Sequence, residues 1–64
     1  MRLADQPTRL KAWRKRMGLT QAAAAKAIGF HRSTYALMEV GARPITARTA
    51  ALCRYVEGGG KVGS

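Results

Sequence analysis

Residues 21–40 have the sequence QAAAAKAIGFHRSTYALMEV, and this stretch decides the fold. It indicates two short helices separated by a turn at Gly29. Gly29 directly follows the last apolar position of the first helix, where a left-handed backbone ends many helices and glycine adopts it without steric cost. Two helices that cross through so short a turn need a methyl-sized side chain at the crossing, and Ala25 supplies it. The residues expected to pack this helix-turn-helix together are Ala25, Gly29, Tyr35 and Met38.

The sequence before this motif predicts one more helix. Pro7 is tolerated in a first helical turn, and Leu10, Trp13 and Met17 recur at intervals of three and four residues. Gly18 then ends the helix. Because the alanines of the next helix fill little volume, we expect the aromatic side chains to carry much of the core.

The sequence after the motif predicts a last helix. Arg43 precedes Pro44, which pushes the backbone out of the helical region, and Thr46 is a good N-cap. The inner stripe of this helix is expected to contain Ile45, Thr49, Leu52, Cys53 and Val56.

The whole chain is expected to form one small all-α domain of about four or five helices. Residues 1–6 have no periodicity and are predicted to be a flexible arm, and residues 7–57 form the domain. Residues 58–64, GGGKVGS, contain too little apolar volume to pack and are predicted to be a disordered tail.

Composition limits the function. Twelve Lys and Arg residues against three acids give a net charge of +9, so the expected partner is a polyanion, with nucleic acid first and an anionic membrane second. Glycines at 18, 29 and 41 interrupt any long amphipathic helix, which argues against a membrane-active peptide. One Cys and one His provide no metal cluster, and no paired carboxylates, phosphate loop or activated nucleophile indicates an enzyme. We expect no cofactor, metal or small-molecule ligand, and a cytoplasmic location with Cys53 as a buried hydrophobic residue.

Residues 17–45, MGLTQAAAAKAIGFHRSTYALMEVGARPI, resemble the Cro/C1-type helix-turn-helix family, the λ-repressor-like or XRE-like proteins of phages and bacteria. The resemblance rests on GLTQ at 18–21, the Ala25 and Gly29 pair, RST at 32–34, and Glu39 followed by a glycine and an arginine. It extends over about residues 10–56. It implies a fold of about five helices in which the helix around 32–40 enters the major groove of DNA.

The resemblance also implies which side chains touch DNA. Base edges are expected to be read by Arg32, Ser33 and Leu37, with Ala36 and His31 at the margin. Three alternatives remain open: Arg32 holds a phosphate, Leu37 packs internally or against a partner chain, and His31 caps its helix. The residues implied to contact phosphates are Gln21, which also braces the recognition helix, Thr20, Thr34, Arg43 and Lys26.

Glu39 has a different implied role. In the family, a glutamate at this position pairs with an arginine of the first helix, which corresponds to Arg14 here. A carboxylate facing DNA would repel phosphate, so an inward, paired Glu39 is the expected state, and a solvated Glu39 is the alternative. The chain departs from the family at Ala24, where Leu is usual, and at Val40, where Asn is common.

The function that follows is a sequence-specific transcriptional regulator, a Cro-like repressor that binds a palindromic operator as a homodimer and belongs to a phage or mobile element. Leu52, Tyr55 and Val56 are the candidates for the dimer contact, although the same residues could complete the monomer core. The alternative function is an antitoxin-type or accessory module, which binds a protein partner and represses its own operon.

Overall fold

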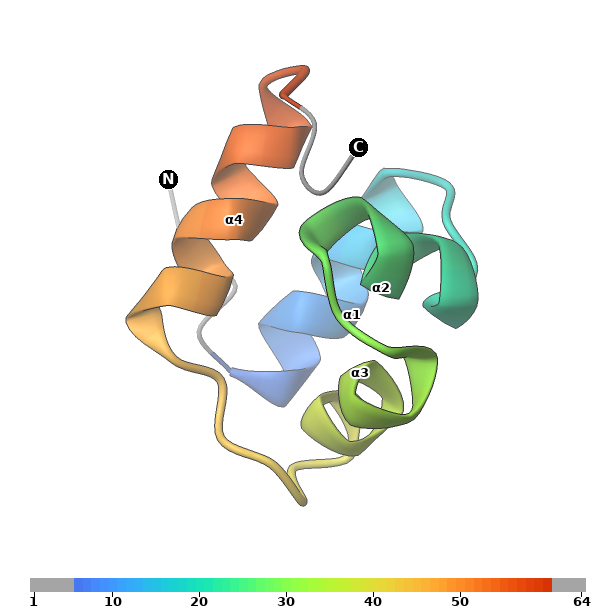
Figure 1. The fold of residues 1–64 in the computed structure, drawn as a ribbon, viewed down its shortest axis with the longest axis vertical. Helices are drawn as coiled ribbons and strands as arrows, with labels where there is room; N and C mark the ends of the chain where they lie inside the picture. Colours follow the sequence, from blue (N-terminus) through green and yellow to red (C-terminus); the bar gives the residue numbers. More distant parts are fainter. Residues whose placement is uncertain (1–5, 61–64) are drawn as a thin grey trace.

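The fold is all-α, as predicted. The computed structural model describes residues 6–60, and within that range it contains four helices: α1 (Pro7–Arg16), α2 (Gln21–Ile28), α3 (Arg32–Glu39) and α4 (Ala47–Glu57). Figure 1 shows α2 and α3 joined by a short turn, with α4 running along the other side of the molecule. The predicted arm falls almost entirely outside the described residues.

The helix ends follow local signals in the sequence. The Thr20 side chain accepts a hydrogen bond from Ala23 N at the start of α2, and Thr46 accepts one from Thr49 N at the start of α4. Gly29 has a φ of 81° and closes α2 in the left-handed conformation, so the predicted turn is confirmed. Pro7 is the first residue of α1, where its missing N–H costs no helical hydrogen bond.

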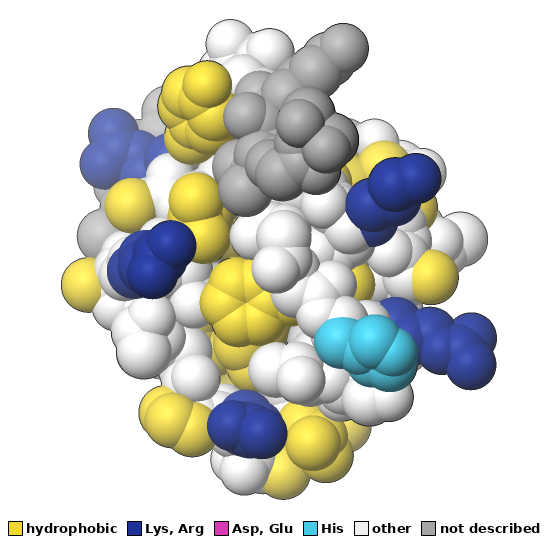
Figure 2. Space-filling view, in the orientation of Figure 1, with side chains coloured by type: hydrophobic (Ala, Val, Ile, Leu, Met, Phe, Trp, Pro, Cys, Tyr) yellow, Lys and Arg dark blue, Asp and Glu magenta, His cyan; other side chains and the backbone are white. Residues whose placement is uncertain are grey.

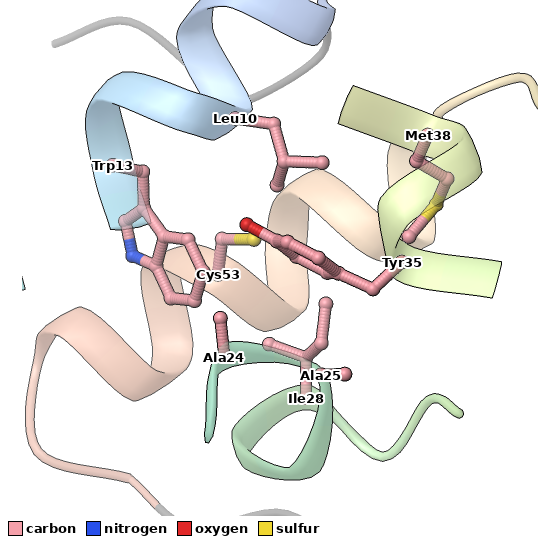
Figure 3. Close-up of a cluster of buried hydrophobic side chains, with 8 residues drawn as sticks. All are labelled: Leu10, Trp13, Ala24, Ala25, Ile28, Tyr35, Met38 and Cys53. Carbon is pink, nitrogen blue, oxygen red and sulfur yellow. The ribbon is translucent and has the colours of Figure 1, made fainter. Parts of the chain in front are cut away.

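The core contains side chains from all four helices (Figure 3). Trp13 of α1 and Tyr35 of α3 are the largest side chains that are fully buried, and Ala24 and Ala25 of α2 lie against them in the same cluster. The slim α2 therefore packs closely between bulky neighbours. Cys53 of α4 is also buried, and burial raises the pKa of its thiol to about 11.

The buried face of α4 differs in part from the predicted stripe. Thr49 and Cys53 are buried as expected, whereas Ile45, Leu52 and Val56 are only partly buried against the core. Ala50, which the stripe omitted, is fully buried. Helix α4 packs on α2, and a small side chain such as that of Ala50 can be buried without holding packed helices apart.

Residues 58–60 form a defined turn, where the sequence predicted disorder. Gly59 N donates to Val56 O at 2.9 Å, and Gly60 N donates to Tyr55 O at 2.9 Å. Gly59 has a φ of 96°, so the glycines supply the left-handed closure that often ends a helix. Residues 61–64 of the predicted tail lie outside the described residues.

Candidate nucleic-acid interface

Helix α3 has one buried and one exposed face. Tyr35 and Met38 point into the core, and Arg32, Ser33 and Leu37 lie on the exposed side, where 42% of the Leu37 surface is accessible. This exposure favours a surface role for Leu37 over internal packing. The helix thus presents the residues that the resemblance assigns to base reading.

The exposed face begins at His31, which caps α3. His31 Nδ1 accepts a hydrogen bond from Ser33 N at 3.1 Å, at the first turn of α3. The capping role that the sequence left open for His31 is therefore present. The cap also orients the imidazole at the start of the exposed face.

A shallow groove of about 350 Å³ runs between the first turns of α2 and α3. It is lined by Gln21, Ala22, Arg32, Ser33 and Ala36. The first turn of α2 has N–H groups that no helical carbonyl accepts, and the helix dipole makes this end favourable for an anion. One concave surface therefore combines a candidate phosphate contact with candidate base contacts.

A hydrogen-bonded network fixes α2 and α3 relative to α1. Arg14 Nε donates to Glu39 Oε2 at 2.7 Å, and Arg14 Nη2 donates to Glu39 Oε1 at 3.3 Å. Arg14 Nη1 donates to Leu19 O in the α1–α2 connection at 3.0 Å. The Glu39 side chain is 4% exposed and that of Arg14 is 15% exposed. The inward, paired state of Glu39 is therefore the one that the structure contains.

Gln21 belongs to the same network. Its Nε2 donates to Glu39 Oε1 at 3.1 Å, so the amide is held between the start of α2 and the end of α3. The second N–H of this amide stays available for an external acceptor such as a phosphate oxygen. The resemblance implied that Gln21 braces the helix around 32–40, but no local signal in the sequence indicates Glu39 as its partner across 18 residues.

The pKa of Glu39 reflects this environment. Burial raises the pKa of the Glu39 carboxyl group, but the hydrogen bonds from Arg14 and Gln21 lower it. The lowering is the larger effect, so the net pKa lies below its ordinary value. A carboxyl group whose pKa is lower in the folded state than in the unfolded state stabilises the fold at pH values above the unfolded pKa. This stability is lost as the pH falls through the lower, folded pKa.

We expect the free energy of unfolding of the wild type to fall as the pH is lowered below the ordinary pKa of a glutamate and through the lower pKa of Glu39 in the folded state. Glu39→Gln should flatten this dependence, since the residue no longer titrates, whereas Glu57→Gln should leave it steep. Urea unfolding at a series of pH values measures the slopes. Equal slopes for the wild type and Glu39→Gln would contradict the assignment.

The other candidate phosphate contacts lie in different places. Thr20 is exposed at the α2 cap, and Lys26 is exposed in the last turn of α2. Thr34 and Arg43 line a second groove, on the α4 side of α3. The structure thus places Gln21 and Thr20 near Arg32, and it places Thr34 and Arg43 together elsewhere.

The candidate dimer residues are not one exposed patch. Leu52 and Val56 pack against the core, whereas Tyr55 is 57% exposed. Gly60 lies directly against the Tyr55 ring, since an added Cβ would clash with it. Tyr55 is therefore the member of this set that is most available to a second chain.

Basic side chains far outnumber acidic ones in this chain. Figure 2 shows a face with Lys and Arg side chains and His, on which no acidic side chain is visible. Both acids within residues 6–60 are paired with arginine: Glu39 with Arg14, and Glu57 with Arg16 at 2.8 Å. In the same range no helix is long and apolar enough to cross a membrane, and no group of three or more metal-ligating side chains is present.

Comparison with known protein families matches residues 10–53 to a family described as Helix-turn-helix. The match covers more than half of the chain and includes the whole of α2 and α3. No curated protein and no solved structure matches the chain. The family match agrees with the capped, exposed recognition helix and the short turn at Gly29. The chain belongs to the Cro/C1-type helix-turn-helix family of DNA-binding regulators.

Proposed function

We propose that this protein is a sequence-specific repressor that binds a palindromic DNA operator as a homodimer and reads the major groove with α3. The observation that supports this most directly is the groove in which Gln21 lies beside the exposed Arg32 and Ser33. A net charge of +9 supplies the attraction for the phosphate backbone. The setting is the cytoplasm of a bacterium, with a phage or mobile element as the source of the gene.

In this proposal, each part of the motif has a separate task. The Gln21 amide and the first turn of α2 hold a backbone phosphate and set the position of α3. Arg32 then donates to O6 and N7 of a guanine, and Leu37 contacts a thymine methyl group. Arg43, in the connection after α3, contacts the backbone on the other side of the helix.

Dimerisation compensates for the small number of base contacts that one α3 can make. Two copies related by a two-fold axis would read half-sites about 34 Å apart, which is one turn of DNA. Tyr55 is the proposed centre of the contact because it is the exposed member of the candidate set. This arrangement predicts an inverted repeat in the operator.

Repeated selection from a random-sequence DNA pool at near-physiological salt tests the proposal. The salt suppresses nonspecific attraction to phosphates, so enrichment reports base reading. We expect an inverted repeat to be enriched. The proposal fails if no sequence is enriched and affinity collapses with rising salt, and the antitoxin-type or accessory alternative would then take its place.

Substitutions at Arg32 and Gln21 separate base reading from phosphate binding. Arg32→Ala should relax the preference at one base pair and weaken binding to the selected site by about 10- to 100-fold. Gln21→Ala should weaken binding to all sequences alike. Fluorescence anisotropy with the selected site and single-base variants measures both, and Lys15→Ala on α1 is the matched control for a lost charge.

Thermal melting must accompany these measurements, since Gln21→Ala also removes a hydrogen bond to Glu39. If Arg32→Ala weakened binding uniformly and Gln21→Ala changed the preference at one base pair, the two roles would be reversed.

A further inference from the structure

A second groove lies between the end of α2, helix α3 and helix α4. Its volume is about 690 Å³, and apolar side chains line its floor, among them Phe30, Met38 and Leu52. Two guanidinium groups, those of Arg43 and Arg48, belong to its rim. In Figure 2 hydrophobic surface is visible near the centre of the face, with basic side chains around it. The groove is therefore apolar inside and positive at its edge.

The charge of this rim is not neutralised by the protein itself. Within residues 6–60, the side chains of Arg43 and Arg48 have no ion pair or hydrogen bond, and no carboxylate lines the groove. The two acids of that range, Glu39 and Glu57, are paired with arginines elsewhere. Two arginines that line one groove without a counter-charge favour an occupant that carries carboxylates or phosphates.

The apolar floor distinguishes between these occupants. A DNA backbone would satisfy the arginines but would leave Phe30 and Leu52 facing polar sugar and phosphate groups. A second copy of the chain would add further arginines and, among its described residues, would offer only carboxylates that are already paired. A protein segment in which apolar and acidic residues alternate satisfies both the floor and the rim.

We propose that this groove is a docking site for a short acidic segment of another protein, with leucine- or phenylalanine-sized side chains on the floor and carboxylates on Arg43 and Arg48. The apolar side chains supply most of the affinity, because they leave water for a partly buried surface. The two carboxylate–guanidinium pairs fix the direction and register of the segment. Arg43 is also the residue that the proposed function places on the DNA backbone, so the segment and DNA would compete for this side chain.

The experiment is a nuclear magnetic resonance titration of the ¹⁵N-labelled full chain with two synthetic peptides. In the first peptide, leucine and phenylalanine alternate with aspartate. In the second, serine replaces every apolar residue, so the charge is unchanged. We expect the first peptide to shift the amide signals of Thr34, Thr49 and Leu52 most strongly. The second should bind at least about tenfold more weakly, since it buries no large apolar side chain.

Matched charge variants locate the carboxylate contacts. Arg43→Gln combined with Arg48→Gln should weaken binding of the first peptide by about fivefold or more. Lys11→Gln combined with Lys15→Gln removes the same charge from α1 and should have less than about a twofold effect. All four side chains are exposed, so both variants are expected to fold, which circular dichroism checks.

Five results would overturn the proposal. Equal binding of the two peptides, or equal effects of the two charge variants, would mean general attraction to polyanions. No binding of the first peptide would exclude an acidic occupant. Concentration-dependent shifts of the groove signals in the protein alone would assign the groove to a second copy. Shifts of these signals with a short DNA duplex, but not with the peptide, would assign it to the DNA backbone.

Discussion

Trp13→Ala is expected to lower the free energy of unfolding by about 3–5 kcal/mol, the range for removing a buried aromatic side chain. A hydrophobic core in a domain of this size rarely supplies more than about 3–5 kcal/mol in total. The variant should therefore be largely unfolded. Circular dichroism melting and urea unfolding of the wild type and the variant measure the loss.

The reason lies in the composition of α2. Ala24 and Ala25 contribute little volume, so the indole of Trp13 fills the space between α1 and the small side chains (Figure 3). The Trp13 Nε1 group has no hydrogen-bond partner among the described residues, so its value to the fold comes from packing alone. The resemblance implies a leucine where this chain has Ala24, and we expect Trp13 to compensate for the missing volume.

The control is to exchange side-chain volume between positions 13 and 24. Trp13→Leu alone should leave a cavity, and Ala24→Leu alone should overpack the core, each at a cost of about 1–3 kcal/mol. Because the two positions belong to one cluster, the double variant should be more stable than the sum of the single effects predicts. Additive losses would show that Trp13 does not fill the space beside Ala24.

Glu39→Ala is expected to cost about 3 kcal/mol, because it leaves the Arg14 guanidinium without its carboxylate in a mostly buried position. For a domain of this size, that loss corresponds to a drop in Tm of about 12 to 24 °C. Thermal melting at neutral pH measures it. The matched control is Glu57→Ala, which breaks the exposed pair with Arg16 and should cost less than about 1 kcal/mol.

A double substitution that removes both charges distinguishes the cost of an unpaired buried charge from the contribution of the ion pair itself. Arg14→Met combined with Glu39→Leu should be less damaging than Glu39→Ala alone, since no uncompensated charge remains in the interior. The account would be wrong if Glu39→Ala melted like Glu57→Ala, or if the double variant were the least stable of the three.

Local sequence signals were sufficient to predict much of the fold. Glycine after Ile28 and threonine before Gln21 act within one helical turn, so they can be recognised without the tertiary structure. The glycines at 58–60 were misread because composition alone does not distinguish a helix-closing turn from a flexible tail.

Long-range features could not be predicted in the same way. The hydrogen bond from Gln21 to Glu39 and the burial of Ala50 both depend on how the helices cross. The groove beneath Arg43 and Arg48 likewise exists only because α4 returns beside α3. From sequence, its apolar floor is expected to be part of the core, since Met38 and Leu52 fall on the inner faces predicted for their helices.

The reactivity of the single cysteine can report how often the core opens. Cys53 is the only cysteine of the chain, and its thiol is buried, with its pKa raised to about 11, so it should be almost inert while the core is closed. Any reaction with an alkylating reagent must then pass through a conformation in which α4 has moved away from α2. The labelling rate of the unmodified protein therefore measures how often that separation occurs. A bound molecule that slows the labelling stabilises the closed core, and the decrease in rate measures this stabilisation without a mutation or an attached probe.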